Sequence, residues 1–448
     1  MAEFDLIVVG GGSGGVRAAR MAANQGARVA LVEASRLGGT CVNVGCVPKK
    51  LYSYAAHYSA DFADSAGFGW QLEGVRFDWP TLRNRKSAEI ARLNGVYQSL
   101  LEKAGVHIVR GFGRLLGGGR VEVGTQVLQG QHILLATGGR PQSPDFAGAE
   151  YTVTSDQIFD LPTLPRRLLI LGAGYIGVEF AGIFAGLGVQ TSLSWRGDLP
   201  LRGFDQDLRQ RFCREASKHC QLLPGSRCER IERQADDSLQ VLFNDGRVLE
   251  TDLVLAALGR RPLLEGLGLE NTAVSLRPDG TVRVDEQFCT TDPGIHAVGD
   301  VVGHLPLTPV ALAEAMVVVD QLFGQRQRRL DYRFIPTAVF SQPNLATVGL
   351  TEEAARLACA DVAVFETDFR HLRHTLSGRD ERTYMKVLVD LASDRVLGMH
   401  MMGADAGEIL QGFATALVCG LTKTQLDATI GIHPTAAEEF VTLRTRSR

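Results

Sequence analysis

The apolar and glycine-rich positions near the start of the chain follow the order of a nucleotide-binding unit. Residues 4–9 form an apolar run that predicts a buried strand, residues 10–15 a glycine-rich turn, and residues 16–24 a helix. Residues 28–32 predict a second strand, which leads into Glu33. Glycines let the turn approach a phosphate, and an acid after the second strand can bind a ribose hydroxyl. The pattern therefore predicts a dinucleotide site.

A second copy of this pattern follows later in the chain. Residues 167–171 predict a strand, residues 172–177 a glycine loop, residues 178–187 a helix and residues 189–194 the next strand. An internal repeat of a dinucleotide-binding unit indicates two nucleotide sites.

The second copy differs from the first after its second strand. No acid stands there; Arg196 and Arg202 follow instead. Arginines suit a 2′-phosphate, so the difference favours NADPH at the second site. Two surface arginines on a loop are the alternative, and Asp198 between them weakens the interpretation only slightly.

Three further apolar runs end in glycine turns. Residues 134–137 lead to Gly138, residues 254–258 to Gly259, and residues 295–298 to Gly299-Asp300. The first two runs are expected to close the two nucleotide segments. Asp300 could face a cofactor or could only stabilise its own turn.

Beyond about residue 330 the pattern changes to that of an α+β module. Strands are expected at residues 385–389 and 396–401, and helices at residues 407–419 and 423–428. The module ends near His433 and Glu438. A lone histidine is more often structural, although Glu438 could orient the imidazole for proton transfer near neutral pH. The spacing alone leaves both roles open.

Composition excludes several classes of protein. The 448 residues are 45% hydrophobic and 22% charged, with a net charge of −3, which predicts two to four ordinary globular domains. Residues 326–329 are locally basic and are expected to form a solvated turn rather than a nucleic-acid site. No apolar run approaches the roughly 20 residues of a membrane span, and residues 1–5 show no signal segment. We expect a cytoplasmic protein that binds neither membrane nor nucleic acid.

Cys41 and Cys46 are the candidate chemical centre. On a regular helix these positions would lie about 140° apart. A disulfide needs Cα atoms within about 7 Å, so the backbone must turn between the cysteines, and Gly45 permits that. The spacing therefore predicts a redox-active disulfide rather than a continuous helix.

Two alternative roles of this cysteine pair are less favoured. An iron–sulfur run would need another C-x2-C soon after, but the next cysteine is Cys213. Two buried structural cysteines are disfavoured beside Lys49 and Lys50, because a nearby cation lowers a thiol pKa.

Together these segments resemble the flavin-dependent pyridine nucleotide–disulfide oxidoreductases, and within that family the glutathione reductases. The similarity extends from Phe4 to near Thr442, with six motifs in order. The segment from Gly38 to Lys50 is similar to the glutathione reductase form, whereas dihydrolipoamide dehydrogenases usually carry Ser-Lys in place of Lys49-Lys50. Dihydrolipoamide dehydrogenase and a reductase of a modified glutathione disulfide are the alternatives.

The resemblance implies an α/β fold with two Rossmann-like dinucleotide-binding domains, for FAD and NADPH, the second inserted in the first, plus a C-terminal α+β dimerisation domain. The expected FAD domain comprises residues 1–143 and a central part at 264–333. The expected NADPH domain is residues 144–263, and the interface domain residues 334–448.

The resemblance also implies a chemistry. NADPH reduces FAD, gated by Tyr175, and Lys49 pairs with Glu179 beside the flavin. Cys46 faces the flavin, while Cys41 attacks glutathione disulfide.

The resemblance also implies that His433 takes up and returns the proton of the disulfide exchange, and that Glu438 fixes the tautomer of His433. In the family this histidine comes from the partner subunit, so a homodimer is expected.

The binding residues follow from the same resemblance. Those for FAD are Gly10, Gly12, Ser13, Gly14, Gly15, Glu33, Gly39, Thr40, Cys41, Lys49, Thr137, Gly138, Asp300 and Thr308. Those for NADPH are Gly172, Gly174, Tyr175, Ile176, Gly177, Glu179, Arg196, Arg202 and Gly259. Those for glutathione disulfide are Ser13, Arg20 and Tyr97.

Several of these positions could have a different role. Tyr97 could be a core residue, because apolar positions at 90, 93, 96, 100 and 101 form a helical stripe around it. Met316 stands where many relatives have an arginine, and Ala436-Ala437 replaces Ser-Ser. Both differences bear on which glutathione-type disulfide is the substrate. Gly177 is commoner in NADH-using relatives and concerns the strictness of NADPH preference.

Overall fold

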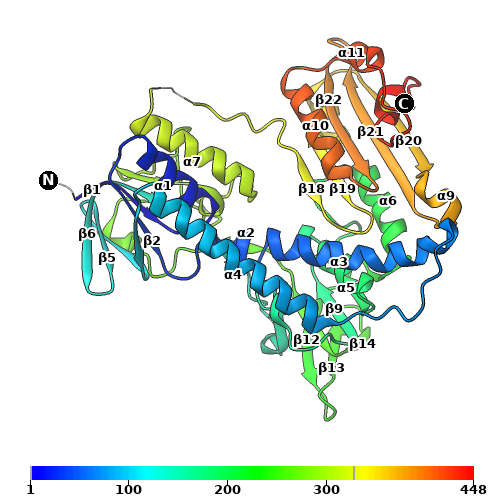
Figure 1. The fold of residues 1–448 in the computed structure, drawn as a ribbon, viewed down its shortest axis with the longest axis horizontal. Helices are drawn as coiled ribbons and strands as arrows, with labels where there is room; N and C mark the ends of the chain where they lie inside the picture. Colours follow the sequence, from blue (N-terminus) through cyan, green and yellow to red (C-terminus); the bar gives the residue numbers. More distant parts are fainter. Residues whose placement is uncertain (1–2, 326–327) are drawn as a thin grey trace.

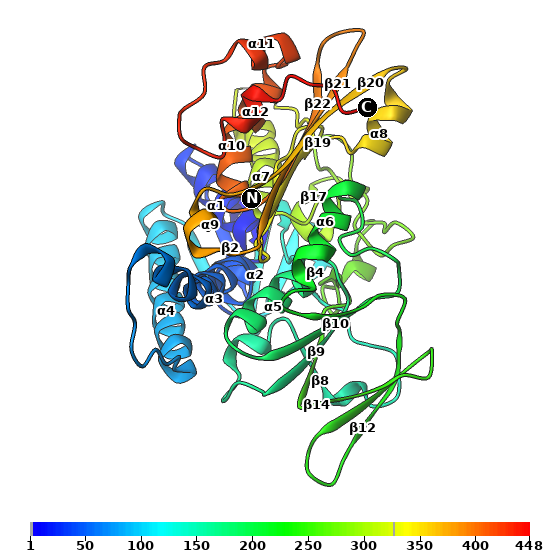
Figure 2. The same cartoon turned by 90° about the vertical axis from the view of Figure 1, so that its right-hand side faces the viewer.

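The computed structural model describes residues 3–325 and 328–448, shown in two views in Figures 1 and 2. The expected turn at residues 326–329 lies partly outside the described residues. Three large sheets organise the chain: one of seven strands and one of five strands, both with parallel cores, and an antiparallel sheet of five strands near the C-terminus.

The first nucleotide unit is a sheet with a parallel core and an antiparallel edge, and two helices cover one of its faces. Strand β1 pairs in parallel with β2 and β6, and β6 pairs with β17, while α1 packs beside α7 (Figure 1). Its elements are β1 (Phe4–Val9), α1 (Ser13–Asn24), β2 (Val29–Glu33), β3 (His107–Arg110), β4 (Gly113–Gly117), β5 (Arg120–Val123), β6 (Gln126–Leu135), β17 (Ile295–Ala297) and α7 (Thr308–Phe323).

The predicted helix start in this unit was three residues late. Helix α1 begins at Ser13, inside the glycine loop, and not at residue 16. The reason is the packing of Gly15, where a Cβ atom would lie 1.9 Å from the carbonyl oxygen of Gly10. Glycine propensity alone had suggested a turn, but the tight first turn of this helix needs a residue without a side chain.

The second nucleotide unit repeats the first. Strand β9 pairs in parallel with β10 and β15, and a Cβ at Gly177 would again lie 1.9 Å from a carbonyl oxygen, that of Gly172. Helix α5 therefore also starts three residues earlier than predicted. Its elements are β8 (Thr152–Thr154), β9 (Arg167–Leu171), α5 (Tyr175–Gly186), β10 (Gln190–Ser194), α6 (Gln206–Ala216), β11 (Gln221–Leu223), β12 (Cys228–Arg233), β13 (Leu239–Phe243), β14 (Val248–Thr251) and β15 (Leu253–Ala256).

The second unit is inserted in the first. Strand β7 (Gly139–Pro141), before the insertion, pairs antiparallel with β16 (Arg260–Pro262), after it. The chain therefore enters and leaves the inserted unit side by side, which confirms the expected insertion.

The C-terminal module is an antiparallel sheet with helices against it, in the upper right of Figure 1. The predicted strands and helices are present, within three residues at each end. Its elements are β18 (Thr337–Val339), β19 (Leu345–Gly349), α8 (Glu352–Ala358), β20 (Val362–Arg370), α9 (Arg373–Ser377), β21 (Arg382–Asp390), β22 (Val396–Met402), α10 (Ala406–Val418), α11 (Lys423–Ala428) and α12 (Glu439–Thr442).

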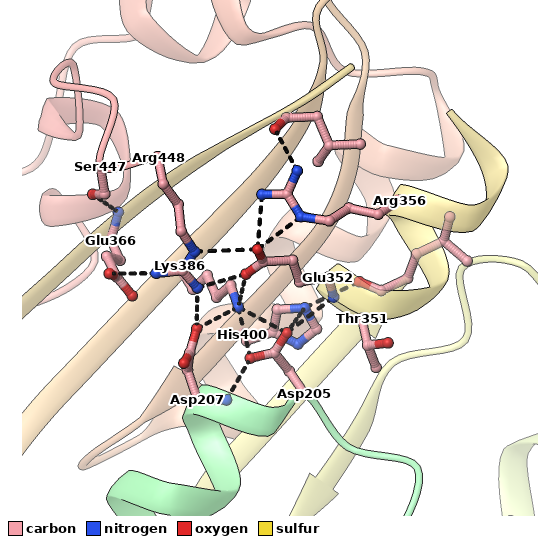
Figure 3. Close-up of polar contacts among 12 residues, drawn as sticks. Asp205, Asp207, Thr351, Glu352, Arg356, Glu366, Lys386, His400, Ser447 and Arg448 are labelled. Atoms are coloured by element: carbon pink, nitrogen blue, oxygen red, sulfur yellow. Dashed lines mark hydrogen bonds and ion pairs between the residues drawn. The ribbon is translucent and has the colours of Figure 1, made fainter. Parts of the chain in front are cut away.

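Buried charges join this module to the second nucleotide unit (Figure 3). The ammonium of Lys386, on β21, is 1% exposed and lies 2.9 Å from both carboxylate oxygens of Asp205, at the start of α6. It also lies 2.7 Å from Asp207 and 2.8 Å from Glu352. Asp205 and Asp207 belong to the second unit, whereas Glu352 lies in the same module as Lys386, so two of the three carboxylates connect the modules.

Helix α3 (Cys46–Ser65) crosses from the first unit to the second (Figure 1). It packs against α5, and the hydroxyl of Tyr52, wholly buried, donates to the carbonyl of Phe159 over 2.7 Å. Helix α4 (Trp79–Lys103) runs beside α3. The helix that begins at one cysteine thus reaches both nucleotide units. Within the described residues no helix combines the length and apolarity needed to cross a bilayer.

Candidate active site

The two cysteines lie on either side of a break between two helices. Two residues, Val44 and Gly45, separate α2 (Gly39–Asn43) from α3, which begins at Cys46. A Cβ at Gly45 would lie 2.8 Å from the carbonyl oxygen of Thr40, so the break needs glycine there. The expected interruption between Cys41 and Cys46 is confirmed.

The same segment is docked on the first glycine loop. The backbone N–H of Gly38 donates to the carbonyl of Gly11 over 2.8 Å. A Cβ at Gly39 would lie 2.6 Å from the Cα of Gly12, so only glycine permits this approach. The cysteine pair is therefore held at the phosphate-binding end of the first unit.

Both cysteines are thiols in this structure, and they interact. The hydrogen bond between them lowers the pKa of Cys46 to about 6 and raises the pKa of Cys41. The hydroxyl of Thr308, at the start of α7, lies 3.6 Å from the Cys46 sulfur and further favours its thiolate, while Ser13 contacts Cys41. The charge of Lys49 also lowers the pKa of Cys46, as expected from its place in the sequence, although less than the Cys41 hydrogen bond does.

Lys49 pairs with Glu179, as expected. Their charged atoms lie 2.6 Å apart in a largely buried contact between α3 and α5. The same Glu179 oxygen accepts the backbone N–H of Phe340 over 2.9 Å, and the ammonium groups of Lys49 and Lys50 lie 4.2 and 3.6 Å from the centre of the Phe340 ring. Phe340 follows β18 and had no signal in the sequence. The site therefore joins both nucleotide units and the C-terminal module.

Tyr175 stands at the mouth of the second glycine loop, as the first residue of α5, and is 40% exposed. Burial of its ring raises the pKa of its hydroxyl to about 12, and the charges of Arg260, Asp300 and Cys46 reach it. Its position between the two units fits a gate.

Arg260 is a site residue that sequence reasoning missed, although it directly follows Gly259. Its guanidinium donates to Thr40 over 3.2 Å and to the carbonyl of Gly139, and lies 3.9 Å from Asp300. Burial raises the pKa of Asp300, and Arg260 opposes that shift. The buried Nε of Arg260 has no hydrogen-bond partner among the described residues. This Nε is the atom that lies 3.9 Å from Asp300, so the two groups face each other as an ion pair without a hydrogen bond.

The first glycine loop fits a dinucleotide. The two carboxylate oxygens of Glu33 each accept a backbone N–H over 2.6 Å, one from Gly11 and one from Ser35, which places the acid beside the loop. Around a Cβ at Gly12 the nearest described atom would be 3.8 Å away, on Gly39, so there is open space at the start of α1. No described side chain caps this helix, and its first N–H groups are left for an anion.

The remaining expected FAD residues lie around this loop. Gly10, Gly14 and Gly15 build it, Gly138 follows β6, and the Thr137 hydroxyl donates to the carbonyl of Leu263 over 2.7 Å.

The second glycine loop opens on a cleft of about 1170 Å³. No described atom would lie within 4 Å of a Cβ at Gly174. Gly177 and Glu179 are buried behind the loop. Of the residues expected to bind NADPH, the lining includes Gly172, Gly174, Tyr175, Ile176, Arg196, Arg202 and Gly259.

The arginine loop beside this cleft is firmly held. The backbone N–H of Leu201 donates to the carbonyl of Ala173 in the glycine loop over 2.8 Å. The side chain of Arg209, on α6, donates to the carbonyls of Leu199 and Pro200 over 2.9 and 2.6 Å. Arg196 and Arg202 are exposed on this fixed loop, so the cleft fits a phosphorylated nucleotide.

The expected substrate residues gather near the cysteines. Arg17 and Arg20 lie on α1, and Tyr97 lies on α4. Burial raises the pKa of Tyr97, and the charges of Cys41 and Arg20 act on its hydroxyl. Tyr97 and Met316, on α7, pack against the same hydrophobic cluster.

The expected core stripe around Tyr97 was only partly right. Ile90 and Leu101 are buried, but Val96 and Leu100 are 39% and 36% exposed. Within this chain α4 contacts α1, α2, α3 and β3, and these contacts leave Val96 and Leu100 uncovered. Tyr97 is therefore half-buried at the edge of the core.

His433 and Glu438 form the expected pair, with 3.0 Å between the imidazole Nδ1 and a carboxylate oxygen. The His433 side chain is 82% exposed, and Ile432 beside it is 76% exposed. Within the described part of the chain, no hydrogen bond or ion pair joins His433 to Cys41 or Cys46. The His433–Glu438 pair is therefore formed and exposed, but it is not bonded to the sulfurs of its own chain.

Comparison with known proteins identifies the family. Residues 4–315 match the family model for pyridine nucleotide-disulphide oxidoreductase, and residues 335–444 match its dimerisation domain. The chain is 49% identical to a glutathione reductase of Burkholderia cepacia, with 99% of both chains covered, and 44% identical to one of Nostoc sp., again with 99% of both covered. It is 43% identical to the chloroplastic/mitochondrial glutathione reductase of Pisum sativum, covering all of this chain and 83% of the relative. The chain therefore belongs to the pyridine nucleotide-disulphide oxidoreductase family, in the group of the glutathione reductases.

Proposed function

We propose that this chain is an NADPH-dependent reductase of glutathione disulfide that uses FAD and serves thiol redox homeostasis. The observation that carries the proposal is the position of Cys41 and Cys46: the pair docks on the first glycine loop, and α3, which begins at Cys46, contacts the helix of the second loop through Lys49 and Glu179. FAD, held at the first loop, supplies electron transfer between nicotinamide and sulfur. The glutathione reductases named above support the choice of substrate.

The two sulfurs have different roles because their protons are held differently. Cys46 is a thiolate near neutral pH, since the Cys41 hydrogen bond lowers its pKa to about 6. Cys41 keeps its proton and needs a base before it can attack. His433 can act as that base, because Glu438 holds Nδ1 and leaves Nε2 to take the proton.

Exchange then proceeds in two balanced displacements. The Cys41 thiolate attacks one sulfur of glutathione disulfide, the disulfide bond breaks, and the first glutathione leaves with the proton from His433. The Cys46 thiolate attacks the Cys41 sulfur of the mixed disulfide. This step forms the Cys41–Cys46 disulfide and releases the second glutathione.

The histidine is proposed to act across a homodimer. His433 is exposed and makes no described contact with Cys41, and residues 335–444 match a dimerisation domain. Each active site would combine the cysteines of one subunit with His433 of the partner subunit. Mixed dimers of Cys41→Ser and His433→Ala chains should regain one of two sites, whereas each parent homodimer is inactive. Without recovery after subunit exchange, this arrangement is wrong.

Recognition of glutathione disulfide is proposed to be electrostatic. Arg20, with Arg17 one turn earlier, presents positive charge near Tyr97 and Cys41, which suits the carboxylates of glutathione. Met316 offers no charge, so binding is expected to be weaker than in relatives with arginine there. Arg20→Glu should raise KM for glutathione disulfide more than it lowers kcat, because the contact acts on binding.

One assay separates this function from its rivals. It crosses NADPH and NADH with glutathione disulfide, lipoamide and trypanothione disulfide. We expect the NADPH and glutathione disulfide combination to be fastest. NADH with lipoamide would indicate a dihydrolipoamide dehydrogenase, and no turnover with any disulfide would indicate a redox-sensing flavoprotein.

Domain boundaries and location complete the proposal. The FAD domain comprises residues 1–143 and 264–333, the NADPH domain residues 144–263 and the interface domain residues 334–448. A cytoplasmic location suits the proposed chemistry, because disulfides in that compartment are usually transient and catalytic.

A further inference from the structure

Two further arginines, Arg209 and Arg227, line the nucleotide cleft besides the two that the sequence pattern identified. Arg227 lies in the segment between β11 and β12 and contributes to the lining together with Arg196 and Arg202. Strands β10 and β11 are parallel neighbours, with Ser194 opposite Leu223. The segments that follow them meet at the same edge of the sheet, where ligands of such sheets bind.

Hydrogen bonds tie these two segments together. The N–H of Ser226 donates to the carbonyl of Trp195 over 2.9 Å, and the N–H of Gly225 donates to the carbonyl of Gly197 over 3.2 Å. The hydroxyls of Ser194 and Ser226 lie 2.8 Å apart. Trp195 and Gly197 flank Arg196, and Ser226 precedes Arg227. The two arginines therefore lie where these hydrogen-bonded segments meet.

The backbone of Arg227 is fixed by hydrogen bonds, while its side chain is largely exposed and makes a long ion pair. Its N–H donates to the Asn244 side chain over 2.7 Å, and its carbonyl accepts the Asn244 N–H over 3.0 Å. Among the described residues its guanidinium has one ion-pair partner, Glu229 at 3.8 Å, and both side chains are largely exposed. Such a pair contributes little, so a dianionic group can displace it.

The other charges around the cleft leave Arg227 available to a phosphate. Arg209 already donates to Leu199 and Pro200 and supports the loop. Within the described residues no ion pair occupies Arg196 or Arg202, and the acids of the lining are Asp145, Asp198 and Glu229. A phosphate monoester carries up to two charges and three acceptor oxygens, which suits several guanidinium groups.

We propose that Arg227 is a specificity-determining residue that, with Arg196 and Arg202, binds the 2′-phosphate of NADPH. The inference rests on the proposed use of NADPH and extends it to a residue outside the glycine-loop motif. Arg227 would thus add discrimination in a chain whose third loop glycine, Gly177, is commoner in NADH-using relatives.

The kinetic test compares Arg227→Ala with Arg227→Lys and with a matched control. Arg233→Ala is that control, because Arg233 ends the strand that follows Arg227, pairs with Asp237 and does not line the cleft. Loss of one exposed phosphate contact should raise KM for NADPH about five- to tenfold in Arg227→Ala, with kcat and the NADH parameters nearly unchanged. Arg227→Lys should restore part of the loss, and added salt should narrow the difference. Equal effects on NADPH and NADH, or no effect, would overturn the proposal.

A binding test separates this inference from the proposed function. Adenosine 2′,5′-bisphosphate and adenosine 5′-monophosphate are titrated calorimetrically into the wild type and each variant, without any turnover. We expect Arg227→Ala to weaken only the bisphosphate. If the wild type binds the bisphosphate and Arg227→Ala binds it equally well, Arg227 has no such role, whatever the disulfide substrate. If the wild type does not prefer the bisphosphate, both this inference and the NADPH assignment fail.

Discussion

The two nucleotide-binding units dock the segment after their second strand in the same way but use it for different chemistry. In the first unit the N–H of Gly38 donates to the carbonyl of Gly11 over 2.8 Å; in the second the N–H of Leu201 donates to the carbonyl of Ala173 over 2.8 Å. The first docked segment leads to the cysteine pair. The second carries the arginines. One backbone device thus positions either a redox centre or a phosphate site, and function depends on the docked side chains.

The ends of the second strands show the same divergence. Val32 pairs with Val9 and Ser194 with Leu171, so Glu33 and Trp195, which follow them, occupy corresponding positions. Glu33 accepts the N–H of Gly11, whereas Trp195 is 7% exposed and packs in the core. The second unit has exchanged an acid for an apolar anchor, which removes the negative charge that would repel a 2′-phosphate.

The largest expected effect comes from the sulfurs of the first unit. Cys41→Ser and Cys46→Ser should each lower turnover of glutathione disulfide at least about a thousandfold, because exchange needs both. In the reduced wild type, alkylation at pH 7, followed by mass spectrometry, should label Cys46 quickly and Cys41 slowly. The opposite order of labelling would reverse the assignment of the thiolate.

The next largest effect concerns the buried charges that join the second unit, but not the first, to the C-terminal sheet through Lys386. Lys386→Met leaves Asp205, Asp207 and Glu352 without their shared cation and should lower the free energy of unfolding by about 3–5 kcal/mol. Urea denaturation measures this. Lys423→Met, which removes one carboxylate contact, to Asp427, is the control and should cost much less. Equal losses in the two variants would mean that the network is no special anchor.

The same network predicts a dependence on pH. Burial by itself would raise the pKa of Asp205, but His400 and Lys386 outweigh it and hold the pKa below its usual value. The contribution of Asp205 to the free energy of unfolding is therefore fully present above the ordinary carboxyl pKa. It is lost as the pH falls from that value through the lowered pKa of the folded state. Lys386→Met should flatten this part of the stability profile.

A smaller effect is expected at the arginine loop. Charge-assisted contacts to phosphate contribute roughly 1.5–3 kcal/mol, so Arg196→Ala with Arg202→Ala should lower the selectivity for NADPH over NADH at least about tenfold. Steady-state kinetics with both nucleotides measure it, with Arg233→Ala as control. If the preference for NADPH were unchanged, the docked segment of the second unit would not determine the nucleotide, and its contrast with the first unit would be wrong.

The smallest effect concerns a single hydroxyl beside the thiolate. In the wild type, alkylation of Cys46 should increase with pH about a midpoint near 6, because the thiolate forms above that pKa. Thr308→Val removes the hydroxyl that lies 3.6 Å from the sulfur and should raise the midpoint by a few tenths of a pH unit to about one unit. Thr152→Val, at a threonine in the second unit whose hydroxyl donates to the carbonyl of Ala149 over 2.7 Å, is the control. A midpoint unmoved by Thr308→Val would mean that the Thr308 hydroxyl does not stabilise the Cys46 thiolate.

Local patterns in the sequence predicted the repeated strands, the glycine loops, the break at Gly45 and the pairing of His433 with Glu438. Each depends on residues close together in the chain. The early starts of α1 and α5 were missed because Gly15 and Gly177 function in packing rather than in a turn. The exposure of Val96 was missed because periodicity does not say how far a neighbouring helix extends.

The sequence by itself determined which chemistry the chain can perform: a thiol pair, two nucleotide loops and a histidine with its carboxylate. Only the tertiary structure decided how these parts meet. Phe340, Arg260 and Lys386 reach the site or its supports from segments far along the chain, and their contacts depend on how separate modules pack. The two pKa values of the cysteines also arise in three dimensions, because a hydrogen bond between neighbouring sulfurs needs the backbone break that brings them together.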